Sequence, residues 1–85
     1  MAVKVKRYYF EISYLVHYSN TGEIIESSIG GDVKSESPDL ILTYAKNFLK
    51  EINENVEQYL TFLVWENFGK GELIISEDIS TVEVL

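Results

Sequence analysis

The sequence predicts a small α+β domain, in which one helix packs across one face of a four-stranded antiparallel sheet. Four stretches rich in β-favouring residues form two pairs, and the members of each pair are joined by turn-forming residues. A single stretch of helical periodicity separates the two pairs. The simplest two-layer solution for this ββαββ order is a helix covering one sheet face. We therefore expect residues 1–85 to form one domain, since 85 residues suit a single modest core.

The first strand is predicted by strict alternation from Arg7 to Tyr18. Even-numbered positions are aromatic or β-branched throughout, whereas odd-numbered positions include Arg7, Glu11 and His17. Period-two alternation of this kind is typical of a strand with one buried face. We expect the even-numbered side chains to lie under the helix and the odd-numbered ones, including Tyr9, to point the other way.

A second strand follows within residues 23–33. Residues Ser19–Gly22 favour a turn, because asparagine and glycine tolerate positive φ. The second strand should therefore pair antiparallel with the first. Gly30 and Gly31 should bend or end this strand, or let another backbone approach it closely.

The helix is predicted to begin at Pro38. Ser37 suits the N-cap, Pro38 the first helical position, and Asp39 the positive end of the helix dipole. Apolar residues at three- and four-residue steps extend the expected helix to about Val56. The expected core stripe is Ile41, Ala45, Phe48, Ile52 and Val56, widened by Leu40, Tyr44 and Leu49.

Two further strands are predicted in residues 59–68 and 72–79, joined by the glycine-rich turn at 69–71. Whether Val82–Leu85 adds a fifth strand is left open. One helix covers about one sheet face, so the other face should be partly bare, with Tyr9, Leu15, Leu63 and Trp65 as candidates to line it. An exposed apolar patch of this kind indicates a partner or a second copy of the chain.

The charge balance is strongly acidic, with 14 acidic and 7 basic residues and a net charge of −7. An acidic field attracts basic partners and repels nucleic acid and anionic membranes, although it can also serve solubility alone. The chain has no cysteine, and its first residues lack the apolar run of a signal peptide. We therefore expect a cytoplasmic protein that binds neither membranes nor, directly, nucleic acid.

Sequence signatures of catalysis are missing. The only histidine, His17, stands in a strand, and neither a Gly-x-Ser-x-Gly elbow nor a Gly-Lys-Ser/Thr phosphate loop occurs. The adjacent Glu77 and Asp78 should point to opposite faces of a strand and cannot share a site without a bend. We expect no enzyme activity, no metal and no cofactor.

These observations favour an acidic protein-interaction module. A sharper version is a phage-type inhibitor, a decoy whose carboxylates mimic nucleic-acid phosphates and block the basic groove of a nuclease or DNA-binding protein. The candidate partner-binding residues are Glu51, Glu54, Glu57, Glu66, Glu77, Asp78, Tyr9 and Trp65. Glu51, Glu54 and Glu57 have helical spacing and are expected to share a helix face.

The alternative is a structural role as a homodimer or assembly subunit. The long first strand and residues 80–85 could supply unpaired sheet edges, and the bare sheet face could supply a second interface.

Overall fold

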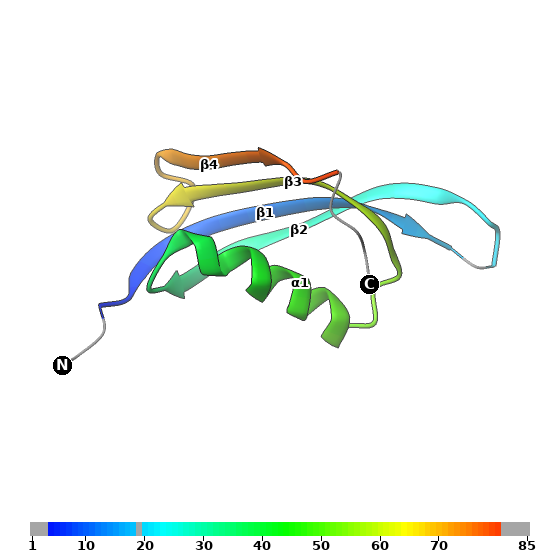
Figure 1. Cartoon of the computed structure of the whole chain (residues 1–85), viewed down its shortest axis with the longest axis horizontal. Helices are drawn as coiled ribbons and strands as arrows, with labels where there is room; N and C mark the ends of the chain where they lie inside the picture. The colour runs from blue at the N-terminus through cyan, green and yellow to red at the C-terminus, as the bar shows by residue number, and fades with distance from the viewer. Residues whose placement is uncertain (1–3, 19, 81–85) are drawn as a thin grey trace.

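The computed structural model of the chain describes residues 4–18 and 20–80 and shows an antiparallel four-stranded sheet with one helix across one face (Figure 1). The strands are ordered β2-β1-β3-β4. The elements are β1 (Lys6–His17), β2 (Ile24–Ser35), a 3₁₀ turn (Pro38–Leu40), α1 (Ile41–Glu51), β3 (Val56–Glu66) and β4 (Leu73–Asp78). The predicted α+β class and ββαββ order are confirmed. Val82–Leu85, the possible fifth strand, lies outside the described residues.

The long hairpin of β1 and β2 forms one half of the sheet. Its register runs without interruption from Lys6 opposite Ser35 to His17 opposite Ile24. Gly22 closes the turn with φ 76° and donates its N–H to the Tyr18 carbonyl oxygen at 2.8 Å. Only glycine adopts this φ without steric cost, as the turn chemistry of the sequence indicates.

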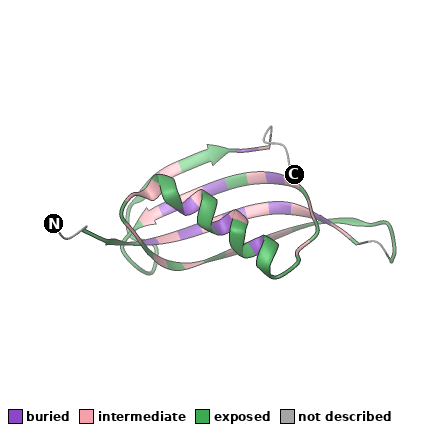
Figure 2. Ribbon diagram, turned by 60° about the horizontal axis from the view of Figure 1, so that its bottom comes forward, coloured by how far each residue is buried: buried purple, intermediate pink, exposed green. Residues whose placement is uncertain are grey.

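The core lies between the sheet and α1, as Figure 2 shows by the purple segments beneath the helix. The even-numbered face of β1 is buried from Tyr8 to Val16, which confirms the predicted alternation. Tyr18 is the exception, because it lies beyond the end of β1 and is half exposed. The other buried residues are Ile41, Ala45, Leu49, Tyr59, Phe62, Val64 and Ile79.

The helix is shorter than its periodicity predicts, since α1 ends at Glu51 and Val56 begins β3. Asn53 takes the left-handed conformation with φ 57° and donates its N–H to the Lys50 carbonyl oxygen at 3.1 Å. Glu54 donates its N–H to the Leu49 carbonyl oxygen at 3.0 Å. These two bonds form the Schellman arrangement that ends a helix, and asparagine is the residue after glycine that best tolerates it.

The buried face of α1 also differs from the prediction. Ile41, Ala45 and Leu49 face the sheet, whereas Phe48 and Ile52, which were expected in the core, are exposed. One row at four-residue spacing is enough to cover the sheet beneath α1, so the neighbouring row is turned outward. In the described ranges, no helix is long and apolar enough to cross a membrane.

Candidate interaction surface

Four large apolar side chains form an exposed row along α1 and its first turn. The exposed fractions are 54% for Leu40, 50% for Tyr44, 39% for Phe48 and 47% for Ile52. Their four-residue spacing places them on one side of the helix, and we call them the helix stripe. Single exposed apolar residues are normal, but a continuous row indicates a contact surface.

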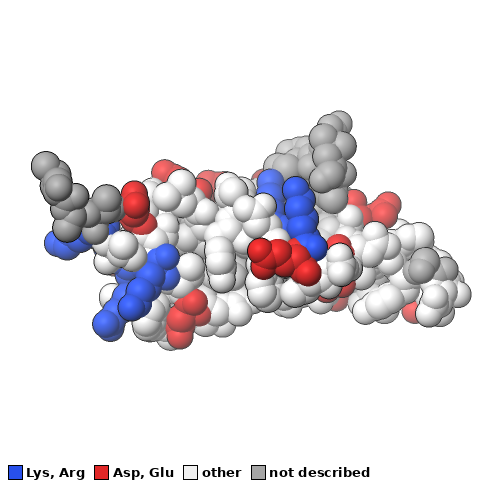
Figure 3. Space-filling view, turned by 90° about the horizontal axis from the view of Figure 1, so that it is seen from below, with Lys and Arg blue, Asp and Glu red and all other residues white. Residues whose placement is uncertain are grey.

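Two open hollows lie between the helix stripe and β2. The larger, of about 440 Å³, is lined by Asp32, Val33, Lys34, Ser35, Leu40, Ile41 and Tyr44. The smaller, of about 160 Å³, is lined by Phe10, Ile29, Gly30, Gly31, Asp32, Tyr44 and Phe48. Tyr44 and Asp32 border both hollows, so the two hollows are adjacent, and we call the pair the α1–β2 groove. Seen from below, the helix-side face shows uncharged surface between two places where basic and acidic side chains lie side by side (Figure 3).

Sequence periodicity alone did not identify this surface. Periodicity places Leu40 and Tyr44 at the margin of the core stripe and Phe48 and Ile52 within it. The width of the apolar sector does indicate the surface, because α1 carries more apolar rows than one contact with a sheet can bury.

The strand beside the groove has an unpaired edge. β2 is an edge strand of the sheet, and among the described residues its 12 positions pair with β1 alone. Tyr18 donates its N–H to the Glu23 carbonyl oxygen at 2.9 Å, so the odd-numbered residues of β2 bond to β1. The N–H and C=O groups of even-numbered residues 24–34 therefore point away from the sheet, and within the described chain they have no backbone partner.

On the opposite sheet face, Tyr9 and Trp65 form an aromatic pair. They are directly opposite in the β1–β3 register, with ring centroids 5.7 Å apart at an interplanar angle of 66°. Edge-to-face pairs of this kind stabilise a sheet beyond the area that they bury. Two of the candidate partner-binding residues thus lie together, although both are half-buried.

The β3–β4 loop folds back over this pair, so the face is less bare at this end than predicted. The Lys70 Nζ atom lies 5.4 Å from the Tyr9 ring centroid and 5.0 Å from that of Trp65, and 2.8 Å from Glu11 Oε1. Hydrogen bonding to Glu11 raises the pKa of Lys70. Gly69 donates its N–H to Asp32 Oδ1 at 3.1 Å, which holds the loop to β2. Leu15 and Leu63 are only partly covered.

The three acidic residues expected on one helix face lie on three different segments. Glu51 ends α1, Glu54 lies in the connection, and Glu57 belongs to β3, because the helix stops before Asn53. Glu54 Oε2 accepts a hydrogen bond from the Tyr14 hydroxyl at 3.1 Å, so this carboxylate is tied to the core. Burial raises the pKa of Tyr14, and the Glu54 carboxylate adds to the effect.

Of the remaining acidic candidates, two lie beside the middle of β3 and one lies at its C-terminal end. Glu77 and Asp78 are opposite Phe62 and Thr61 and so point to different faces, as expected. Asp78 Oδ1 accepts the Ser80 N–H at 2.9 Å, and hydrogen bonding to Ser80 lowers the pKa of Asp78. Glu66 ends β3 at the other end of the sheet (Figure 1).

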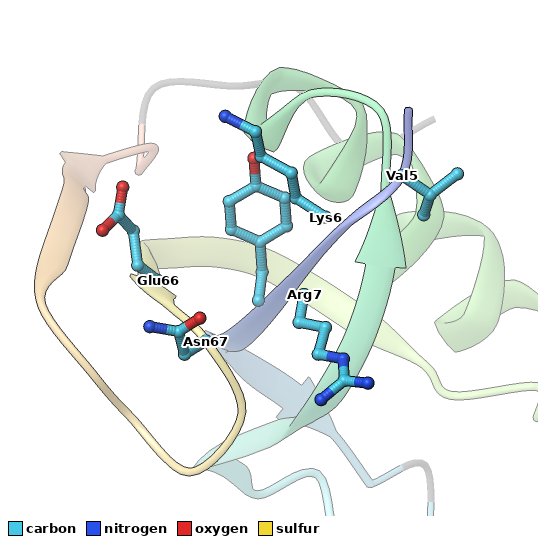
Figure 4. A pocket seen from close by; sticks show the side chains of 6 residues that line it. Val5, Lys6, Arg7, Glu66 and Asn67 are labelled. Carbon is cyan, nitrogen blue, oxygen red and sulfur yellow. The ribbon is translucent and has the colours of Figure 1, made fainter. Parts of the chain in front are cut away.

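A third hollow, of about 310 Å³, lies beside the start of β1. It is lined by Val5, Lys6, Arg7, Tyr8, Glu66 and Asn67. Figure 4 shows Lys6 and Glu66 extending to one side and Arg7 to the other. The Arg7 guanidinium lies 5.3 Å from the Phe68 ring centroid, so its contact is with the β3–β4 loop. Charges of both signs therefore border this hollow.

Among residues 4–18 and 20–80, no group of three or more histidine, cysteine, aspartate or glutamate side chains could hold a metal ion. Compared with known protein families, curated proteins and solved structures, the chain matches none of them.

Proposed function

We propose that this chain is a protein-interaction module, which acts by binding through the α1–β2 groove rather than by catalysis. The observation that carries the proposal is the helix stripe, an exposed apolar row beside β2, whose outer edge has no strand partner in the described chain. Apolar side chains supply binding energy, while a free strand edge supplies directional backbone hydrogen bonds. The proposal includes a cytoplasmic location, which suits a chain without cysteine.

The groove indicates the chemistry of a partner. Its centre is apolar at Tyr44 and Phe48, and Asp32 and Lys34 of β2 form part of its border. A partner would present apolar side chains to the centre and charged or polar side chains to the rim, the usual anatomy of a protein interface. The net charge of −7 would also speed association with a basic partner.

A pair of matched double variants tests this proposal. Tyr44→Ser/Phe48→Ser removes the middle of the helix stripe, and Leu73→Ser/Ile74→Ser removes two exposed apolar residues of β4 as a control. Quantitative capture from host lysate should fall at least about tenfold for the first variant, since central aromatic residues dominate binding, and stay near wild type for the second. Equal capture by both variants and the wild type would contradict the role of the groove.

The decoy function stays a second candidate, favoured by the placement of the acidic residues. α1 ends and β3 begins close together (Figure 1), so Glu51, Glu54 and Glu57, three of the six acidic candidates, share that end of the sheet. In the described chain, a single salt bridge occurs, between Lys70 and Glu11, and these three acidic candidates are not part of it. Such a cluster could take the place of phosphates in a basic groove.

Charge reversal tests the decoy. Glu51→Lys/Glu57→Lys reverses two exposed charges at the acidic end and leaves Glu54, which bonds Tyr14, in place. Glu66→Lys/Glu72→Lys makes the same change of net charge at the other end. Inhibition of a basic nuclease should be lost by the first variant alone and should weaken with salt. Equal losses in both variants would show that only net charge matters.

A further inference from the structure

We propose that the partner of the α1–β2 groove is a second copy of this chain, which pairs with the first through antiparallel β2 strands. This inference rests on the proposed function and names its partner. The two sheets would join into one of eight strands, with both helices on the same face.

The geometry of β2 permits this pairing. Its outward N–H and C=O groups belong to even-numbered residues, so a two-fold pair of β2 strands must place even-numbered residues opposite each other. Every such register also keeps the odd-numbered side chains of both copies, including Ile29 and Val33, on the helix side. Half-buried in one copy, these two side chains would be covered further by the partner strand.

Charge complementarity selects one register among these. With Gly30 opposite Gly30 of the second copy, Glu26 is opposite Lys34 twice, and Ser28 is opposite Asp32 twice. A shift of two residues one way places Glu26 opposite Asp32, and a shift the other way places it opposite Glu36. Shifting two more residues in this second direction places Asp32 opposite Asp32 of the other copy. Opposite charges facing each other across strands stabilise a sheet and like charges destabilise it.

The side chains near the two-fold axis fit a close approach. Glu26 and Lys34 are exposed and project to the face opposite α1, where no helix obstructs them. Ser28 is small, which suits its place beside Asp32 and the β3–β4 loop that Asp32 holds. On the helix side Ile29 faces Gly31, whose missing side chain leaves open space.

The like net charges of two copies oppose this association, so dimerisation should have a characteristic dependence on salt concentration. Each copy carries −7, so two copies repel at long range while Glu26 and Lys34 attract at contact. Moderate salt screens the long-range repulsion, and dimerisation should therefore strengthen from low to physiological ionic strength. Binding of a basic partner at the same groove would weaken over that range.

Sedimentation equilibrium of charge-swap variants tests the register. Glu26→Lys and Lys34→Glu alone should each raise the dimer dissociation constant about tenfold, because each replaces two attractive charge pairs by two repulsive ones. The double variant Glu26→Lys/Lys34→Glu should restore it. An equimolar mixture of the two single variants should form heterodimers in preference to either homodimer, since all its charge pairs are then opposite.

Two results would overturn this inference. A wild-type chain that stays monomeric up to millimolar concentration excludes the dimer, and a dimer indifferent to the charge swap excludes the register. The proposed function fails separately, when the Tyr44→Ser/Phe48→Ser variant captures as much partner as the wild type. If the chain is monomeric but still captures a different protein through the helix stripe, the proposed function stands and the dimer is excluded.

Discussion

The buried hydroxyl of Tyr14 links the centre of the core to the acidic end of the molecule. The side chain has no exposed surface, and its hydroxyl donates to Glu54 Oε2 at 3.1 Å. This bond explains why a tyrosine rather than a phenylalanine stands there, and why Glu54 differs from its acidic neighbours.

Replacing Tyr14 tests this role. Tyr14→Phe should lower the free energy of unfolding by about 1–2 kcal/mol, because a hydrogen bond to a charged acceptor is lost. Tyr59→Phe is the control, since Tyr59 is buried beside β1 without a side-chain hydrogen bond in the described chain, and it should cost less. Urea denaturation at neutral pH measures both. Equal costs would show that the Tyr14–Glu54 bond contributes nothing of its own.

Alkaline pH should destabilise the fold through the same residues. Burial raises the pKa of both Tyr14 and Tyr59 above 10.0. The unfolded chain loses these protons first, so their contribution to stability is complete below about pH 10 and falls as the pH rises toward the raised pKa values. Denaturant unfolding at increasing pH should show this fall, and Tyr14→Phe should make it shallower. A wild-type stability that is flat from about pH 9 to about pH 11 would contradict the assignment.

At the scale of elements, Asn53 decides where α1 ends. Its positive φ costs an L-residue with a Cβ atom about 1 kcal/mol unless its side chain eases the strain, so Asn53→Ala should destabilise by about that amount. Asn53→Gly should be neutral or slightly stabilising. Thermal unfolding of the two variants gives the comparison. A fully tolerated alanine would indicate that the helix can run on toward Val56, as its periodicity alone predicts.

The two adjacent glycines of β2 have different roles. A Cβ atom at Gly30 would meet the Phe10 carbonyl oxygen and the Glu11 side chain, whereas one at Gly31 would meet nothing within 4 Å. Gly30→Ala should therefore cost about 2 kcal/mol or more, in the range of overpacked sites. Gly31→Ala should change stability by no more than about 1 kcal/mol. Chemical denaturation measures both, and equal effects would contradict the close approach of β1 to Gly30.

For the whole molecule, local sequence patterns predict the order of the elements well, but they predict the contacts between elements less well. The alternation of β1 is a local signal, and the strand formed where it indicates. The cap at Ser37 is also local, but it starts a 3₁₀ turn at Pro38–Leu40, and α1 begins only at Ile41 rather than at the predicted Pro38. The end of α1 depends on one left-handed residue, Asn53, which periodicity does not report. The exposure of Phe48 and Ile52 depends on how much sheet lies beneath the helix, which is a property of the assembled layers.

The candidate site shows the same division. Sequence reasoning paired Tyr9 with Trp65 on one face, and the register brings them together. It did not anticipate that Lys70 would cover them, because the β3–β4 loop folds back through positive φ values at Asn67, Gly69 and Lys70. The α1–β2 groove arises between two consecutive elements, but the position of β2 at the edge of the sheet and the outward turn of the helix stripe follow only from the assembled layers.

Both the proposed groove and the proposed dimer require the outer edge of β2 to be a contact surface. Residue-resolved amide hydrogen exchange tests it directly, in dilute chain and then in concentrated chain or in the presence of a captured partner. In dilute chain the N–H groups of Ile25, Ser27 and Ile29 should be protected, while those of Glu26, Ser28 and Asp32 exchange rapidly. On association the second set should become protected as well. If Glu26, Ser28 and Asp32 exchange equally fast in both states, β2 is not the contact edge.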